Sequence, residues 1–309
     1  MREIGRRCFL KATAGTALAS GLAQLPGGIV GTAPARDDSP LPRRKLGRID
    51  HEPTIVSLGG MTTVREADRR EEALEIVRHA VDSGINYIDT ADSYADGASE
   101  RHIGEALGDR RNRVFLATKT RQRRAEPIVN QAFEASCERL RTEIIDLYFL
   151  HAVHTFDDLD AALDRDGGAI KAFEHFRDAG RLRYLGISSH SSEVLIAAMD
   201  RYDFDGVFVT LNPAGRAMLD PENTNAMLAK AAEKNVGVVA MKIYGGTGGR
   251  IFENDQLTAE QALRYALSHP VATATIGITR VEQIDHNIQM AKDFVPYTPE
   301  ECLALARSF

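Results

Sequence analysis

Four ionisable side chains stand where apolar runs of the sequence end, and together they have the chemistry needed to protonate a carbonyl oxygen. Asp89 and Tyr94 follow one such run, Lys119 ends the next, and His151 ends a third. A phenol, whose ordinary pKa is about 10, becomes a better acid when a nearby cation favours its ionised form. Lys119 would supply that cation, and Asp89 would balance and orient it. We therefore predict acid–base catalysis with Tyr94 as proton donor, and His151 as a hydrogen-bonding or proton-relaying partner.

Each of these residues alone also has a purely structural explanation. The structural roles would be a helix cap for Asp89, an apolar loop residue for Tyr94, a solvated strand end for Lys119 and a hydrogen-bonded core residue for His151. Their joint placement favours a site, because Asp and Lys buried at neighbouring strand ends are costly unless they are paired and used.

The elements that must position these residues repeat along the chain from residue 54. Each unit is a short β-branched apolar run, a turn and an amphipathic helical stretch. The predicted strands are 54–58, 86–91, 114–119, 146–151, 184–188, 206–211, 236–243 and 272–278. Eight near-continuously apolar strands in series predict an α/β fold, a single closed (β/α)8 TIM barrel with its chemistry on the loops after the strands.

The loop after the first predicted strand argues against the main structural alternative, an open doubly wound sheet. That fold would carry G-x-G-x-x-G here, whereas the chain has Gly59-Gly60-Met61-Thr62. Ahead of this strand, residues 43–51 contain a turn-like Leu46-Gly47-Arg48. They predict a short N-terminal hairpin that plugs the bottom of the barrel. Residues 36–309 are therefore expected to form one domain.

The first 35 residues are similar to an export signal. Arg6-Arg7 precede an apolar stretch of 14 residues, from Ala12 to Leu25, and the small-residue sequence Ala33-Pro34-Ala35. This order is typical of a twin-arginine signal peptide, whose pathway carries folded proteins, and the stretch is too short to span a bilayer. We expect recognition by the twin-arginine export machinery, cleavage near Ala35, no membrane anchor afterwards, and a periplasmic or extracellular location. The alternative is a frayed basic helix.

The overall composition is that of a globular protein, with 43% hydrophobic and 27% charged residues. The formal net charge is −6, although the first 35 residues hold four Lys or Arg and one acidic residue, so the remainder is more acidic still. That balance disfavours a nucleic-acid partner. Cys8, Cys137 and Cys302 lack the spacing of a zinc site or a disulfide framework, and no metal is expected.

Three segments of the chain resemble the aldo-keto reductase family. They are G-I-N-Y-I-D-T-A-D-S-Y at 84–94, F-L-A-T-K-T at 115–120 and D-L-Y-F-L-H at 146–151, within a resemblance that extends over residues 42 to about 292. The family's catalytic Asp, Tyr, Lys and His fall on the four residues named above, which we call the tetrad. The resemblance implies a small-molecule carbonyl or alcohol substrate and a nicotinamide cofactor as the source of hydride.

The resemblance also places cofactor contacts along the chain. Ser188 and Ser189 would bind the carboxamide, where the family usually has Ser-Asn, and Phe208 stands where the family has a Gln. A Gly-rich loop after the seventh predicted strand would hold the pyrophosphate through its backbone amides. The contacts predicted in this loop and in the loop after the first strand are Gly60, Met61, Met241, Lys242, Gly245 and Gly246, with Met241 near the nicotinamide.

The segment at 277–288 resembles the family's adenosine-phosphate segment. Arg280 is the expected clamp, with Gln283 and Asn287 on the same face of the following helix. Some family members have further cations where this chain has Gly277 and Gln283. Because Arg280 is retained, the resemblance favours NADP(H) over NAD(H).

Two other functions compete with a reductase. In a barrel lyase, Lys119 would form a Schiff base, but Tyr94 and Arg280 would then have no role. In a non-catalytic nicotinamide-binding subunit, the cofactor would serve redox sensing. For a reductase, substrate selectivity would depend on the loops 152–168 and 212–224.

Overall fold

The computed structural model describes residues 39–123, 126–246, 249–252 and 257–309, and Pro40–Phe309 forms one compact unit. The predicted export signal lies outside the described residues. Eight parallel strands form a closed barrel in sequence order, with β8 paired to β1. The strands are β1 (Val56–Gly59), β2 (Tyr87–Asp89), β3 (Phe115–Thr120), β4 (Ile145–Leu150), β5 (Leu182–Ser189), β6 (Gly206–Thr210), β7 (Gly237–Met241) and β8 (Thr273–Gly277). The predicted barrel is confirmed, and each strand end lies within two residues of its predicted position.

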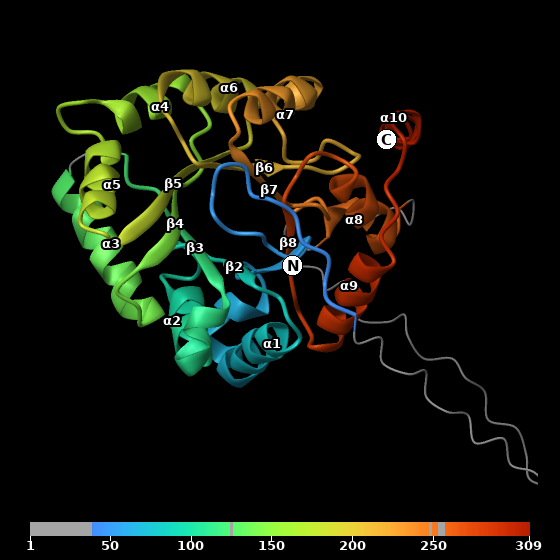
Figure 1. Cartoon of the computed structure of the whole chain (residues 1–309), viewed down its shortest axis with the longest axis horizontal. Helices are drawn as coiled ribbons and strands as arrows, with labels where there is room; N and C mark the ends of the chain where they lie inside the picture. Colours follow the sequence, from blue (N-terminus) through green and yellow to red (C-terminus); the bar gives the residue numbers. More distant parts are fainter. Residues whose placement is uncertain (1–38, 124–125, 247–248, 253–256) are drawn as a thin grey trace, which may run out of the picture. The chain divides into compact units, whose positions relative to one another are not determined.

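Helices surround the barrel (Figure 1). They are α1 (Arg70–Asp82), α2 (Ala98–Leu107), α3 (Glu126–Leu140), α4 (Phe156–Leu163), α5 (Ala169–Asp178), α6 (Ser192–Arg201), α7 (Thr224–Glu233), α8 (Ala259–Leu267), α9 (Glu282–Lys292) and α10 (Pro299–Ala306). Short 3₁₀ helices cover Thr63–Arg65, Ala67–Arg69, Gly108–Arg113, Pro221–Asn223 and Arg250–Phe252. Segment 152–168, expected to be a loop, contains α4. The Thr155 side chain caps this helix by accepting a bond from the Asp158 N–H at 3.1 Å.

The N-terminal hairpin closes the end of the barrel at which the strands begin. Leu46 and Ile49 face each other across an antiparallel bridge, and both are buried in the interior cluster with Tyr87 and Phe115. Gly47, at the turn, has a φ of +55°, and a Cβ there would lie 2.3 Å from the backbone nitrogen of Gly237. The turn therefore requires glycine. The predicted plug is confirmed.

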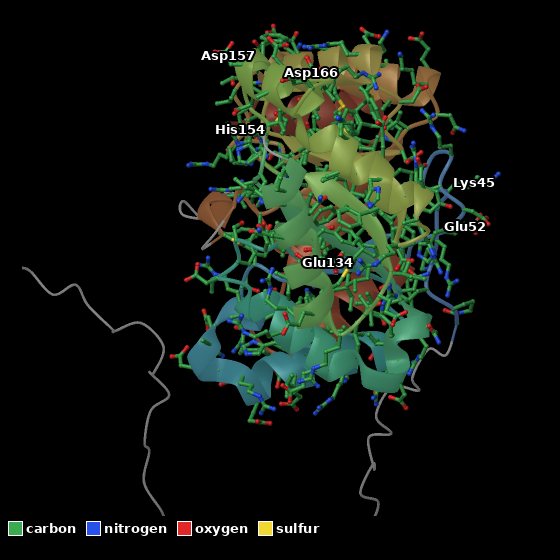
Figure 2. All side chains as sticks on the ribbon, turned by 90° about the vertical axis from the view of Figure 1, so that its left-hand side faces the viewer. Lys45, Glu52, Glu134, His154, Asp157 and Asp166 are labelled. Atoms are coloured by element: carbon green, nitrogen blue, oxygen red, sulfur yellow. The ribbon has the colours of Figure 1, made fainter. Side chains whose placement is uncertain are left out.

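The two ends of the barrel differ in what they carry. Figure 2 shows Lys45 and Glu52 at the hairpin end and His154 at the opposite end, where the loops after the strands gather. Within the described ranges, no helix is long and apolar enough to cross a membrane. In the same ranges, no three His, Cys, Asp or Glu side chains are grouped to hold a metal ion.

Candidate active site

Lys119 and Asp89 form a buried ion pair at the carboxyl ends of two adjacent strands. Asp89 ends β2 and Lys119 lies in β3, and the Lys119 Nζ is 2.7 and 2.6 Å from the two carboxylate oxygens of Asp89. The Nζ also donates to the backbone carbonyl of Thr90 at 2.5 Å. Both side chains are almost wholly shielded from solvent, since Lys119 is 0% and Asp89 2% exposed. The pair therefore satisfies the condition under which such charges can be buried.

The ionisation of this pair follows from burial and mutual attraction. Burial raises the pKa of Asp89 to about 6, even though the charge of Lys119 lowers it. Burial lowers the pKa of Lys119, but the negative charge of Asp89 and the contribution of Tyr94 outweigh it and leave that pKa above its ordinary value. At neutral pH the lysine is an ammonium ion held by a carboxylate.

Tyr94 reaches the pair from the loop between β2 and α2. The Lys119 Nζ lies 5.0 Å from the centroid of the Tyr94 ring. After Tyr94, residues 95–97 have φ values of 48°, 51° and 77°, in the left-handed region. That conformation costs a non-glycine residue about 1 kcal/mol or more. The loop that presents Tyr94 is therefore strained and must be held by its surroundings.

A buried carboxylate that sequence reasoning missed supports this loop. Glu100, in the first turn of α2, is 0% exposed. It accepts hydrogen bonds from the Thr118 hydroxyl and from Arg139 Nε, both at 2.6 Å. Thr118 precedes Lys119 in β3, so the network ties the start of α2 to the strand that carries the lysine. A single Glu in an amphipathic helix gives no sequence signal for such a role.

The Tyr94 hydroxyl keeps its proton at neutral pH. Burial raises its pKa, the charge on Lys119 lowers it, and the net pKa lies above the ordinary value. The predicted lowering by Lys119 is thus present, but the burial of Tyr94 outweighs it, and the sequence does not reveal the depth of burial. A protonated phenol beside an ammonium ion is the form that a general acid needs before it reacts.

His151 directly follows β4 and completes the tetrad. Its ring centroid lies 5.9 Å from that of Tyr94, with the rings at 79°, and its Nδ1 lies 3.4 Å from the Ser93 Oγ. Burial, followed by the positive charge of Lys119 and of other nearby cations, lowers its pKa to about 2. The imidazole is therefore neutral. The two roles predicted for it, hydrogen bonding to a substrate oxygen and proton relay, stay predictions.

Phe208 contacts the tetrad directly. It pairs in register with Ser188 across β5 and β6, and its ring centroid lies 4.9 Å from the Lys119 Nζ and 5.5 Å from that of Phe149. The residue that stands where the family has a Gln thus offers Lys119 a cation–π contact, a role that the sequence did not indicate.

The two serines predicted to bind the carboxamide, Ser188 and Ser189, differ in their hydrogen-bond partners. The Ser188 Oγ accepts a hydrogen bond from the Ala152 N–H at 2.9 Å, which leaves its own hydroxyl proton to be donated. The Ser189 Oγ accepts from the Ser191 N–H at 2.9 Å and lies 3.5 Å from the His154 Nδ1. Ser189 is therefore engaged within its own loop, and Ser188 is better placed to bind a ligand.

The loop after β7 has the tight turn expected of its glycines. Gly245 and Gly246 have φ values of 76° and 95°, and the Gly245 N–H donates to the Lys242 carbonyl at 2.8 Å. Met241 ends β7 and is partly exposed, as a residue stacking on a ligand would be. The Lys242 Nζ lies 2.5 Å from the His190 Nε2, on the loop after β5.

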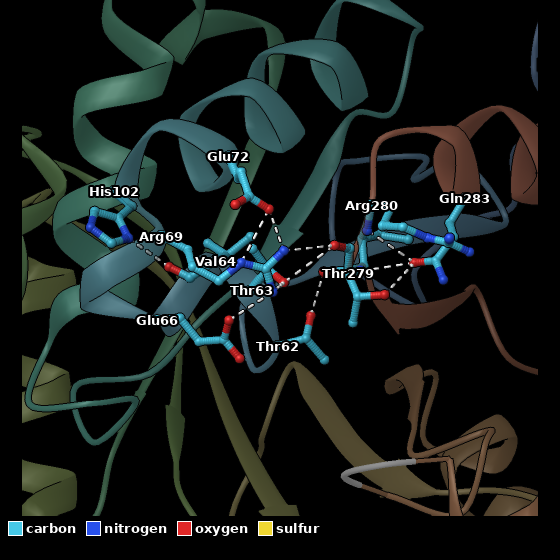
Figure 3. A network of polar contacts seen from close by, with 11 residues as sticks. Thr62, Thr63, Val64, Glu66, Arg69, Glu72, His102, Thr279, Arg280 and Gln283 are labelled. Atoms are coloured by element: carbon cyan, nitrogen blue, oxygen red, sulfur yellow. Dashed lines mark hydrogen bonds and ion pairs between the residues drawn. The ribbon is translucent and has the colours of Figure 1, made fainter. Parts of the chain in front are cut away.

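The loop after β8 is joined to the loop after β1 (Figure 3). Thr62 Oγ1 donates to the Ile278 carbonyl at 2.7 Å, and the Thr279 N–H donates to the Gln283 Oε1 at 2.8 Å. Gln283 thereby ties the loop after β8 to the first turn of α9. Arg280 is exposed, and no carboxylate within the described residues forms an ion pair with it. An unpaired guanidinium at the start of a helix fits a nucleotide phosphate.

The remaining predicted contacts have structural explanations of their own. Gly60 is buried, its N–H donates to the Asp89 carbonyl at 2.8 Å, and a Cβ there would lie 2.4 Å from the Ser99 Oγ. Met61 is partly exposed beside Arg65, and Asn287 is 7% exposed on α9. As cofactor contacts, these three residues stay predictions.

Comparison with known proteins decides the family. A sequence profile of the Aldo/keto reductase family matches residues 56–256. The chain belongs to this family. The uncharacterised oxidoreductase YqkF of Bacillus subtilis is 30% identical over 291 residues, which cover 81% of this chain and 90% of the relative. This reductase therefore catalyses NAD(P)H-dependent carbonyl chemistry, and the lyase and redox-sensor alternatives are not favoured.

Solved structures of similar proteins share the barrel. The holo form of aldo-keto reductase AKR11C1 from Bacillus halodurans has a TM-score of 0.70 and 27% identity, over 87% of this chain and 96% of that chain. An aldo-keto reductase from Klebsiella pneumoniae, solved in complex with NADPH, has a TM-score of 0.68 and 22% identity, over 84% of this chain and 92% of that chain.

Proposed function

We propose that this aldo-keto reductase reduces an aldehyde or ketone with NADPH and that Tyr94 is the general acid. The observation that carries the proposal is the position of Lys119. Its Nζ is held 2.6 Å from Asp89 and lies 5.0 Å from the centroid of the Tyr94 ring. A fixed cation beside a phenol makes proton donation easier, because it stabilises the phenolate left behind.

The residues divide the reaction between them. The substrate oxygen is bound by the Tyr94 hydroxyl and by the neutral imidazole of His151. A bound nicotinamide supplies the hydride that adds to the carbonyl carbon, and Ser188 would hold its carboxamide. As negative charge grows on the oxygen, Tyr94 releases its proton to it. Lys119 stabilises the resulting phenolate, and Asp89 keeps Lys119 in place. In alcohol oxidation the same phenolate accepts the proton.

The state of Lys119 argues against a Schiff-base mechanism. An amine nucleophile must be deprotonated, and lysines of that kind have lowered pKa values. Here burial lowers the pKa of Lys119, but the negative charge of Asp89 and the contribution of Tyr94 together outweigh it and leave that pKa above its ordinary value. Both carboxylate oxygens and the Thr90 carbonyl already bind the Nζ. The lysine is fixed as a charge, not freed as a nucleophile.

NADPH is the proposed form of the cofactor because of Arg280. Its guanidinium is exposed on the loop after β8, without an ion-pair partner in the part of the chain that the structure describes. A charge-assisted bond to a 2′-phosphate is open only to NADPH. The Klebsiella protein of the same fold, which was solved with NADPH, gives independent support.

The test of the proposed function is a screen of the purified protein. NADPH oxidation would be followed at saturating cofactor with aliphatic, aromatic and sugar aldehydes and ketones, and the alcohol products would be identified by mass spectrometry. The proposal expects carbonyl-dependent oxidation with one alcohol formed per cofactor. Bound NADPH with no turnover of any carbonyl would contradict it and return the redox-sensor function to consideration.

We also propose that the chain is exported through the twin-arginine pathway, on the strength of Arg6-Arg7 and the apolar stretch behind them. Because that pathway carries folded proteins, the barrel would be able to leave the cytoplasm with its cofactor bound. Fractionation should find the wild-type chain outside the cytoplasm, cleaved near Ala35. The variant with Arg6→Lys and Arg7→Lys should be found inside the cytoplasm. A wild-type chain found only in the cytoplasm would contradict export.

A further inference from the structure

A second polar cluster, made of Lys242, His190 and His154, lies on the loops after β7, β5 and β4. The Lys242 Nζ is 2.5 Å from the His190 Nε2. The backbone N–H of His190 donates to the Nδ1 of His154 at 3.1 Å, and the centroids of the two imidazole rings are 4.5 Å apart. All three side chains are partly exposed. The mechanism above gives none of them a role.

This cluster borders the tetrad. The positive charges of Lys242 and Arg121 both act on His151, where they add to the effect of burial in lowering its pKa. Arg121, which follows β3 and is exposed, also acts on Tyr94. His154 lies at the end of the barrel opposite Lys45, with the other loops after the strands (Figure 2). A molecule with its carbonyl at Tyr94 and His151 would therefore lie within the electrostatic reach of these two cations.

Lys242 and Arg121 give this part of the site positive charge. Neither Lys242 nor Arg121 forms an ion pair with any described residue. Asp158 acts on His154, where its charge offsets part of the lowering by burial and Lys242. Burial, and then the charges of Arg121 and Lys119, lower the pKa of Lys242 to about 8. Like charges gathered in one partly buried place destabilise one another, and a bound anion relieves that cost.

We propose that Lys242, Arg121, His190 and His154 bind a carboxylate or phosphate carried by the carbonyl substrate. The inference rests on the proposed function and names the substrate class, an anionic aldehyde or ketone. The pyrophosphate of the cofactor is the other source of an anion. The Lys242 Nζ, however, reaches His190 on the β5 side of the barrel, whereas Arg280, the proposed phosphate contact, follows β8. Because the Lys242 Nζ lies toward β5 and the proposed phosphate contact follows β8, the substrate is the favoured source of the anion.

A matched pair of substrates tests the charge alone. 4-Carboxybenzaldehyde and its methyl ester differ little in shape, and only the acid is an anion. The wild type should have a kcat/KM about tenfold or more higher for the acid, the size expected of a charge-assisted contact. Lys242→Met and Arg121→Gln should each remove most of this preference, and Lys242→Arg should keep part of it. Lys45→Met, at the hairpin end, should leave both values unchanged.

Two binding measurements separate the sources of the anion. Fluorescence titration should show that Lys242→Met changes the Kd of NADPH by about threefold or less. A large loss of NADPH affinity in Lys242→Met, with kcat/KM falling equally for acid and ester, would assign Lys242 to the pyrophosphate and overturn the proposal.

The second measurement does not depend on turnover. Calorimetry with NADPH present, where no reaction occurs, should show 4-(hydroxymethyl)benzoate binding about tenfold or more tightly than its methyl ester, and Lys242→Met should remove the difference. Equal binding of the two would overturn the proposal. A clear difference in a protein that reduces no carbonyl would support the anion site and refute the proposed reductase function.

Discussion

The Lys119 Nζ lies 5.0 Å from the centroid of the Tyr94 ring, and the same nitrogen is bound by both carboxylate oxygens of Asp89. The lysine is thus fixed on one side by a full ion pair and presents its charge to the phenol on the other. Burial raises the pKa of Tyr94, and Lys119 lowers it by less. The acid is held protonated, with a cation already in place for the phenolate.

Lys119→Met would remove the charge that lowers the Tyr94 pKa. We expect the rate of reduction to fall by about 10²-fold or more, because the phenolate is no longer stabilised. Alcohol oxidation requires Tyr94 to be deprotonated, so its pH profile should move to higher pH. The measurement is kcat against pH in both directions, with Lys45→Met as the matched control. A profile that does not move would show that Lys119 does not tune Tyr94.

His151 should remain neutral throughout the working range of the enzyme. Burial, and then the surrounding cations, lower its pKa to about 2, well below the usual value of about 6.5. In NMR spectra of histidine-labelled protein, the His151 ring shifts should stay constant between about pH 5 and 8. The resonance is assigned by its loss in His151→Gln. A titration step inside that window would contradict a neutral hydrogen-bonding role.

Arg280→Ala should weaken NADPH by about 10- to 100-fold and NADH by much less, because only NADPH carries the 2′-phosphate. Affinities from fluorescence titration of the two cofactors give the comparison. Arg43→Ala, an exposed arginine at the hairpin end, is the control. Equal losses for both cofactors would place Arg280 at a part of the nucleotide that they share.

Gly47→Ala should destabilise the barrel through its plug. The position has a φ of +55°, and the added Cβ would lie 2.3 Å from the backbone nitrogen of Gly237. A clash with backbone combined with a left-handed φ should cost about 2 kcal/mol or more, and lower the Tm by about 4 °C or more. Gly167→Ala, where nothing lies within 4 Å of the new Cβ, is the control. Equal melting temperatures for Gly47→Ala and the wild type would show that the hairpin does not stabilise the barrel.

The barrel and the tetrad were predictable because both depend on short segments of the sequence. Each strand is a short apolar run followed by a turn, and the parallel order of a closed barrel brings every carboxyl end to one mouth. Asp89, Lys119 and His151 each stand at such an end. Tyr94 follows Asp89 on the same loop.

The contacts made across the barrel were not predictable in this way. The cation–π contact of Phe208 with Lys119 joins β6 to β3, and Lys242 meets His190 across β7 and β5. No residue spacing in the sequence predicts such contacts between distant strands. The burial of Glu100, and the extent to which burial outweighs Lys119 at Tyr94, depend on packing depth, which the residue types alone do not fix.

The most direct test of the account is the turnover of Tyr94→Phe. The variant keeps the ring beside Lys119 and His151 and removes only the hydroxyl that donates the proton. We expect the rate of carbonyl reduction to fall by about 10² to 10⁴-fold while the Kd of NADPH changes little. Tyr297→Phe, whose ring lies 3.9 Å from the Arg264 guanidinium and outside the site, should retain full activity. A Tyr94→Phe enzyme with more than about a tenth of the wild-type rate would contradict the assignment of Tyr94 as the acid.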